Sequence, residues 1–203
     1  MKLLQVDSSV LGDASASRQI SQSVTQRLRH DHPGLEVHTR DLAASPIPHL
    51  TGLDLAAGQQ APEDRNEQTR VLAELNETVL REFQDADIVV VGAPMYNFGI
   101  PSALKAWIDR IAIAGKTFRY TEKGPIGLSG GKVVIIASTR GGLYSEGSPA
   151  AAMDHQEAYL RGVFAFLGVT DVRVVRAEGL NLGPEQRQAA LSAVLGVSER
   201  QAA

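Results

Sequence analysis

The chain has 203 residues, of which 43% are hydrophobic and 21% are charged, and it contains no cysteine. This composition is typical of a globular domain with a sizeable core, and the lack of thiols excludes disulfides, cysteine-ligated metals and thiol-based redox chemistry. The formal net charge of −3 gives no general attraction to nucleic acid or to an anionic membrane, and the apolar run before Asp7 is too short for a signal peptide. We therefore expect one cytoplasmic domain over residues 1–203, with no metal site, nucleic-acid partner or membrane span.

Segments typical of strands and helices alternate along the chain, which predicts a parallel sheet with helices on both faces. Five segments are predicted to be strands, over residues 3–6, 35–40, 88–92, 132–138 and 172–176. Helices are predicted over residues 17–29, around an apolar stripe at 72–83, from Pro101 onward, over 149–167 and over 184–195. Short right-handed connections favour the strand order 2-1-3-4-5, which is a flavodoxin-like three-layer α/β sandwich.

Two segments do not fit this simple alternation. Residues 42–66 are too long and too rich in Ala, Gly and Pro for a plain connection, so we expect a covering flap or a partner contact, with a loose surface insertion as the alternative. In residues 116–131 the alternation around Phe118 and Tyr120 predicts a short hairpin strand that turns at Gly124 and Pro125 and overhangs the sheet edge.

A serine-rich loop follows the first predicted strand and leads into the first predicted helix. Ser9 lies in this loop, and Ser15, Ala16 and Ser17 stand at the helix start. The first N–H groups of a helix lack partners within it and carry partial positive charge, so they bind anions, and nearby hydroxyls add hydrogen bonds. No acidic residue occurs in residues 14–30 to offset that charge. The pattern predicts a phosphate-monoester site, and the alternative is an ordinary serine cap.

The glycine-rich segment 127–133, GLSGGKV, does not form a triphosphate-binding loop. Its spacing is wrong, Val133 stands where a magnesium-binding hydroxyl is required, and the segment precedes a strand instead of following one. The sequence also lacks the glycine-rich dinucleotide fingerprint. A monophosphate is therefore the favoured ligand at the first helix.

The segment from Pro94 to Gly99 follows the third predicted strand, which neighbours the first strand in the predicted order. Met95 and Phe98 can pack on the face of a flat ring, while Asn97 and the main chain can hydrogen-bond to its edges. We predict a ring-binding loop. The alternative is that its large side chains anchor the loop in the core.

The fourth predicted strand ends in Thr139, Arg140, Gly141 and Gly142. Adjacent glycines let the main chain approach a ligand closely, and N–H groups together with Arg140 could stabilise negative charge on the ring edge of a reduced cofactor. A plain turn is the alternative. Because this segment and the two preceding loops follow three strands of one parallel sheet, all three are expected at the same edge.

Several of these motifs resemble those of the FMN-dependent NADH-azoreductases, also described as azobenzene or quinone reductases, which have a flavodoxin-like fold. The resemblance covers nearly the whole chain. It rests on Ser9 with residues 15–17, Asp41 and Leu42 with residues 46–48, PMYNFGIPSALK at 94–105, TFRYTE at 117–122, TRGG at 139–142 and FLGVTD at 166–171.

By this resemblance, three groups of residues are expected to bind FMN. The phosphate is expected at Ser9, Ser15, Ala16 and Ser17, the isoalloxazine and ribityl chain at Pro94, Met95, Tyr96, Asn97 and Phe98, and the pyrimidine edge at Thr139, Arg140, Gly141 and Gly142. The expected walls of the substrate pocket are Phe118, Tyr120, Tyr144 and, from a partner chain, Phe166.

The resemblance also implies a homodimer with each flavin near the interface, and a ping-pong reaction. NADH or NADPH would deliver hydride to flavin N5, and an azo compound or quinone would then accept two electrons in the same pocket. No side chain is expected to act as acid or base. The alternatives are a flavodoxin-like electron carrier or an FMN-binding regulatory module without turnover, and a nucleotide-binding module without redox activity.

Overall fold

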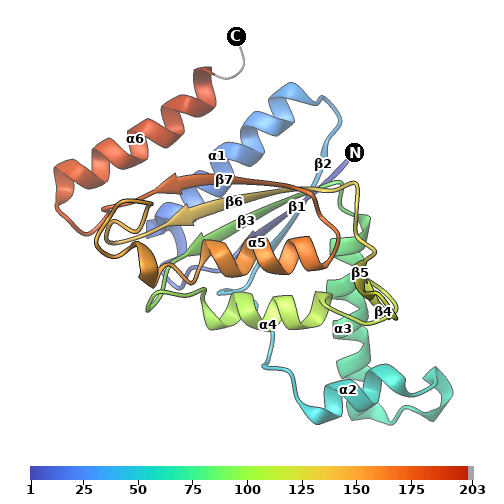
Figure 1. The fold of residues 1–203 in the computed structure, drawn as a ribbon. Helices are drawn as coiled ribbons and strands as arrows, with labels where there is room; N and C mark the ends of the chain where they lie inside the picture. The colour runs from blue at the N-terminus through green and yellow to red at the C-terminus, as the bar shows by residue number, and fades with distance from the viewer. Residues whose placement is uncertain (201–203) are drawn as a thin grey trace.

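The computed structural model describes residues 1–200, with side chains to residue 196. Its main sheet is parallel with the order β2-β1-β3-β6-β7, which confirms the predicted order and the flavodoxin-like fold. These strands are β1 (Lys2–Asp7), β2 (Glu36–Asp41), β3 (Ile88–Pro94), β6 (Val133–Thr139) and β7 (Asp171–Ala177). The main helices are α1 (Ala16–Asp31), α3 (Glu67–Asp85), α4 (Ser102–Ile111), α5 (Glu157–Phe166) and α6 (Pro184–Arg200). In Figure 1, α1 and α6 lie on one face of the sheet and α3, α4 and α5 on the other.

The core lies on both faces of the central strands. Every residue of β3 is buried, as expected for an inner strand of a parallel sheet covered by helices on both sides. On the α3 and α4 face, the rings of Phe83 and Trp107 meet edge to face with centroids 6.0 Å apart. On the other face, Ile20 of α1 and Leu191 of α6 belong to a second buried cluster.

Residues 42–66 are not a loose insertion, because they contain helix α2 (Gly52–Gln59) and a 3₁₀ helix (Pro62–Asp64). Thr51 and Asp54 cap α2 reciprocally, and the buried Asp54 carboxylate pairs with the buried Arg110 guanidinium of α4. Figure 1 shows α2 packed beside α3, away from the arrowheads of the strands. The segment therefore does not cover the carboxyl ends of the strands in its own chain.

The helix predicted over residues 149–167 is wrong in its first half. A 3₁₀ helix (Ala151–Met153) comes first, and α5 begins only at Glu157. Asp154 Oδ1 accepts hydrogen bonds from the main-chain N–H groups of Gln156, at 3.0 Å, and Glu157, at 3.2 Å. The side chain thus takes the place of helical carbonyls and starts a new helix.

The predicted hairpin is present as the antiparallel pair β4 (Phe118–Thr121) and β5 (Gly124–Gly127), but its turn lies at residues 122–123, so the prediction that Gly124 and Pro125 form the turn is wrong. Instead of overhanging the sheet edge, it lies beyond the amino-terminal end of the sheet in Figure 1 and packs on the end of α5. Gly127 crosses Gly168 so closely that a Cβ on Gly127 would lie 2.1 Å from Gly168 N.

No helix within residues 1–200 is long and apolar enough to cross a membrane. A groove of about 560 Å³ lies between α1 and α6, where its walls include Ile20, Val24 and Val175. Its lining comes from the middle of these elements and not from the loops at the carboxyl ends of the strands. The groove is therefore separate from the candidate functional site, which lies in the loops at the carboxyl ends of the strands.

Replacing Gly127 with alanine should destabilise the protein, because the new Cβ would overlap the main chain of Gly168. Such overpacking costs about 1–3 kcal/mol in the free energy of unfolding. The control is Gly130→Ala, whose Cβ would lie 3.4 Å from Gly168 O and should change stability by less than about 0.5 kcal/mol. Urea denaturation measures both, and equal effects would contradict the proposed overlap.

Candidate functional site

Three loops meet at the carboxyl-terminal edge of the sheet, because β1, β3 and β6 are neighbours. The Tyr96 hydroxyl after β3 lies 3.2 Å from Ser9 Oγ and accepts a hydrogen bond from Val10 N, also at 3.2 Å. Met95 N donates to Thr139 O at 2.8 Å, which joins the β3 loop to the end of β6. The structure thus brings together the three segments that the sequence predicted to share one site.

The start of α1 offers main-chain donors and buried hydroxyls. Ser15 is the N-cap and accepts from Arg18 N at 3.3 Å, and its hydroxyl lies 3.0 Å from that of Ser17. The N–H groups of Ala16 and Ser17 have no acceptor among the described residues. Ser15 is therefore a cap, as the simpler interpretation had it, yet two N–H groups remain for an anion at the positive end of the helix dipole.

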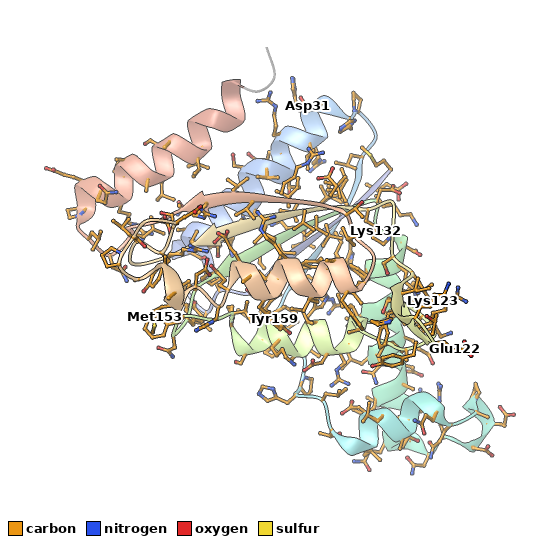
Figure 2. The ribbon with its side chains drawn as sticks, viewed as in Figure 1. Asp31, Glu122, Lys123, Lys132, Met153 and Tyr159 are labelled. Carbon is orange, nitrogen blue, oxygen red and sulfur yellow. The ribbon has the colours of Figure 1, made fainter. Side chains whose placement is uncertain are left out.

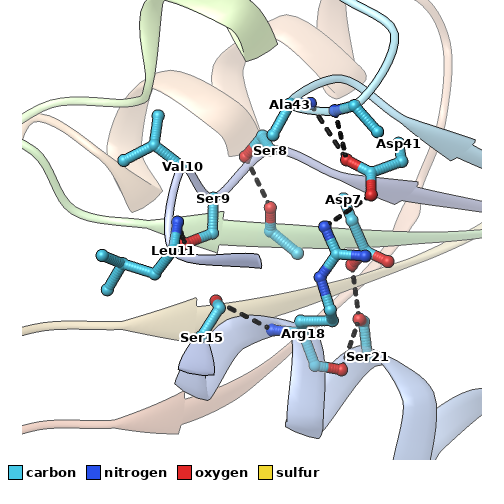
Figure 3. A network of polar contacts seen from close by, with 12 residues as sticks. Asp7, Ser8, Ser9, Val10, Leu11, Ser15, Arg18, Ser21, Asp41 and Ala43 are labelled. Carbon is cyan, nitrogen blue, oxygen red and sulfur yellow. Dashed lines mark hydrogen bonds and ion pairs between the residues drawn. The ribbon is translucent and has the colours of Figure 1, made fainter. Parts of the chain in front are cut away.

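A buried carboxylate lies near the start of α1, in the network drawn in Figure 3. Asp7, at the end of β1, is 1% exposed and accepts hydrogen bonds from Ser21 Oγ at 2.6 Å and Gln5 Nε2 at 2.7 Å. Nearby, Arg18 forms an ion pair of 2.7 Å with Asp41. Burial raises the pKa of Asp7, although its hydrogen bonds and the charge of Arg18 oppose this. No role was assigned to Asp7 or Arg18 from the sequence. The only signal in the sequence was their position, at the end of a predicted strand and at the start of a predicted helix.

The β3 loop is a two-residue hairpin closed by reciprocal main-chain hydrogen bonds between Tyr96 and Gly99, at 3.0 and 3.1 Å. Its central residues both have positive φ, 48° at Asn97 and 70° at Phe98, as a type I′ turn requires. Asn tolerates this region well, whereas a residue like Phe pays about 1–2 kcal/mol. Phe98 is 40% exposed, so it does not anchor the loop in the core. The turn instead leaves the ring partly exposed at the strand ends, in a strained conformation that the surrounding structure must hold.

In the turn after β6, within the described residues, the carbonyl groups are hydrogen-bonded, whereas two N–H groups are not. The carbonyls of Arg140, Gly141 and Gly142 accept from the main chain of residues 179–181, while the N–H groups of Gly141 and Gly142 have no acceptor among the described residues. A Cβ on Gly141 would lie 2.5 Å from Asn181 Nδ2, so a larger residue here would displace the Asn181 side chain. Two main-chain donors without an acceptor in the described part of the chain therefore lie at the end of β6.

The Arg140 side chain does not stabilise a ligand as the sequence suggested. Its guanidinium is 0% exposed and pairs with Asp154 at 2.6 Å, Glu157 at 2.8 Å and Glu178 at 2.9 Å. Its main-chain N–H donates to Ala177 O at 3.0 Å. The expected electrostatic contact with a ring edge is thus wrong for this side chain, because three carboxylates hold it in the interior.

The four aromatic residues predicted to wall the pocket separate into two groups within one chain. Tyr144 meets Phe98 edge to face, with centroids 6.2 Å apart, at the strand ends. Phe118 and Tyr120 lie in the hairpin, near the carboxyl-terminal end of α5. The ring centroid of Phe118 lies 4.5 Å from that of Phe166 and 5.4 Å from that of Tyr120. Figure 2 shows the hairpin residues Glu122 and Lys123 at the opposite end of α5 from Met153. Ten helical residues, about 15 Å, separate the two groups.

Comparisons with known proteins agree with this geometry. Residues 1–201 match the family model described as a flavodoxin-like fold. The chain is 55% identical over 195 residues to an FMN-dependent NADH:quinone oxidoreductase of Rhizobium meliloti (strain 1021), covering 95% of this chain and 92% of the relative. A relative with the same description from Ralstonia nicotianae is 57% identical, covering 95% and 93%.

Two solved structures are similar along the full length. An azoreductase from Bacillus anthracis superposes with a TM-score of 0.88 at 29% identity, covering 98% of this chain and 97% of that one. An FMN-dependent NADH-azoreductase from the same species, in complex with FMN, gives 0.87 at 26% identity, covering 100% and 99%. The chain belongs to this flavodoxin-like family of FMN-dependent reductases. Family membership agrees with the resemblance found in the sequence motifs.

The buried Asp7 makes stability depend on pH in a defined direction. Because its pKa is raised above the unfolded value of 3.8, its contribution to stability is full below pH 3.8 and declines as the pH rises through the folded-state pKa. Asp7→Asn does not titrate, so the free energy of unfolding of the variant minus that of the wild type should increase from acid to neutral pH. Urea denaturation at several pH values measures this difference, and a constant difference would contradict the prediction.

Because Phe98 has a positive φ, glycine should give a more stable protein than alanine at this position, which is the reverse of the usual order. Phe98→Ala and Phe98→Gly both remove the ring, but only glycine adopts a φ of 70° without strain. The glycine variant of the cofactor-free protein should therefore be more stable than the alanine variant by about 1 kcal/mol. Ala189→Gly, at an exposed position inside α6, should show the usual loss of about 1 kcal/mol. An alanine variant as stable as the glycine variant would refute the strain.

Proposed function

We propose that this chain is an FMN-dependent NAD(P)H oxidoreductase that reduces quinones and azo compounds by two electrons in a ping-pong reaction. The observation that carries the proposal is two sets of N–H groups without acceptors within residues 1–200, at Ala16 and Ser17 after β1 and at Gly141 and Gly142 after β6, in segments that follow the two neighbours of β3, whose loop carries the exposed Phe98. A phosphate needs donors of the first kind, and a polar ring edge needs donors of the second. The names of the relatives support the same chemistry.

When bound, FMN supplies the hydride and electron transfer. The residues of the chain bind and orient it. Ala16 and Ser17 would hold the phosphate, Met95 and Phe98 would contact the ring, and the N–H groups of the Gly141–Gly142 turn would hold its pyrimidine edge. No step requires a side-chain acid or base.

The proposal includes a homodimer that works as a cytoplasmic enzyme, with residues 1–203 of each chain forming one flavin-binding domain. The argument is the separation of the aromatic residues at opposite ends of α5. A two-fold axis beside α5 brings each end of one helix near the other end of its copy, because the contacts are then reciprocal. Phe118, the 75% exposed Tyr120 and Phe166 of one subunit would thus complete the pocket of the other.

Anaerobic visible spectroscopy of the FMN-reconstituted protein tests the reaction. Bound flavin bands should bleach in one two-electron step with NADH and return when a quinone is added. An electron carrier would instead show a stable one-electron state and slow reaction with NADH, and absence of bound FMN would contradict every flavin-based function.

Ala16→Pro tests the phosphate site by removing one donor. Ala16 is the first residue of α1, where proline is tolerated, and the extended Ser15 (φ −75°, ψ 124°) suits the residue before proline. The Kd for FMN should rise by about tenfold or more, since a hydrogen bond to a charged group contributes about 1.5–3 kcal/mol. Riboflavin, which lacks the phosphate, is the control and should bind both proteins equally. An equal loss for both ligands would contradict the site.

Mixed dimers test whether the pocket is shared. One subunit carries Ala16→Pro and the other carries Tyr120→Ala, so each homodimer should be impaired, the first in FMN binding and the second in quinone reduction. After random exchange, about a quarter of the pockets should combine an intact flavin site with the partner's intact Tyr120. Recovery of quinone reductase activity on mixing is expected, and no recovery between subunits shown to exchange would contradict the shared pocket.

A further inference from the structure

The segment that leads into α5, residues 154–157, contacts the strained β3 loop at two points. His155 N donates to Phe98 O at 3.1 Å, at one of the two non-glycine residues with positive φ. Gln156 Nε2 donates to Ala93 O at 2.6 Å, just before the loop begins. The same short segment therefore holds both the base of the loop and its strained turn.

The Gln156 amide is fixed in one orientation. It is 0% exposed, and its Oε1 accepts from Ser138 Oγ at 3.0 Å and from Arg140 Nε at 3.2 Å. With the oxygen held by two donors, the amide nitrogen points to Ala93 O. A buried amide with this set of partners is specific for one arrangement of the segments around it. Gln156 thus links the end of β3 to the end of β6.

Arg140 holds this segment in place. Its guanidinium binds Asp154 and Glu157 at the two ends of the segment, and also Glu178 after β7. Glu157 is bound further by Arg176 at 2.6 Å. Burial alone would raise the pKa of Glu157, but the hydrogen bonds and charges of the arginines lower it. Glu157 therefore stays ionised at neutral pH and keeps its ion pairs with both arginines.

We propose that Arg140 and Gln156 are positioning residues that hold residues 154–157 as a brace, and that this brace keeps the strained Asn97–Phe98 turn aligned with the Gly141–Gly142 turn. Strained backbone persists only where its surroundings hold it firmly. The inference rests on the proposed function in one respect, since these two turns are the ones assigned to the flavin ring. Neither side chain contacts the flavin. Both act through the main chain of the loops.

Hydrogen exchange in the cofactor-free protein tests the brace without any ligand. The variants are Gln156→Met, which keeps the volume but loses the hydrogen bonds, and Arg140→Lys, which keeps one charge but cannot reach all its partners. The matched control is Arg110→Lys, which alters another fully buried arginine, the one paired with Asp54. The Tyr96 and Gly99 amides, which close the turn, should exchange at least about tenfold faster in the two test variants and at the wild-type rate in the control.

A second measurement connects the brace to the ligand. The Kd for FMN should rise by at least about tenfold in Gln156→Met and Arg140→Lys and stay within about twofold in Arg110→Lys, even where the control lowers the melting temperature as much. Should Arg140→Lys fail to fold, Gln156→Met alone decides the question.

The outcomes separate the two proposals. Test variants that match Arg110→Lys in exchange and in FMN affinity would show that Arg140 and Gln156 only stabilise the fold, which would overturn the inference. Failure of the wild type to bind FMN would overturn the proposed function, and the exchange rates of Tyr96 and Gly99 would still decide whether the brace exists.

Discussion

The parallel pairing of β3 with both β1 and β6 is the constraint on which the rest of the molecule depends. The register places Asp7 opposite Gly92 and Pro94 opposite Thr139, so the three loops begin at nearly the same level of the sheet. Gly92 is required there, because a Cβ would lie 2.6 Å from Asp7 Oδ1. One glycine thus allows a buried carboxylate near the start of α1, while the register assembles donors that are distant in sequence.

The sequence was sufficient to predict the strand order and the meeting of three loops at one edge of the sheet, for identifiable reasons. The residues of β3 are nearly all apolar and read as an inner strand, and turn residues with hydroxyls or rings follow the strands that meet at the switch point. Helix α2 was missed because its own sequence, GLDLAAGQ, has a weak apolar pattern. Its fixed position comes from the pair of Asp54 with Arg110, which are 56 residues apart. No local pattern contains that information.

Arg140 illustrates the same limit within the site. An arginine in a glycine turn at a strand end suggests a contact with an anion. Its actual partners are Asp154, Glu157 and Glu178, which lie between 14 and 38 residues further along the chain, and only the folded arrangement of α5 and β7 beside β6 brings them to it. The neighbouring Gly141 and Gly142 have main-chain N–H groups without acceptors among the described residues. An open main chain at adjacent glycines could be predicted, because main-chain freedom depends on residue type and local conformation.

Helix α5 stands between the two aromatic groups and therefore acts as a spacer. In the proposed dimer the gap between Phe98 of one subunit and the partner's Phe118 depends on how far α5 extends between its ends. The size of acceptor that fits would then be governed by helix length as much as by the residues that touch it. Insertion of a helical turn in α5 would alter the width of the pocket without changing any residue in its walls, which makes helix length a separate variable for redesigning substrate range.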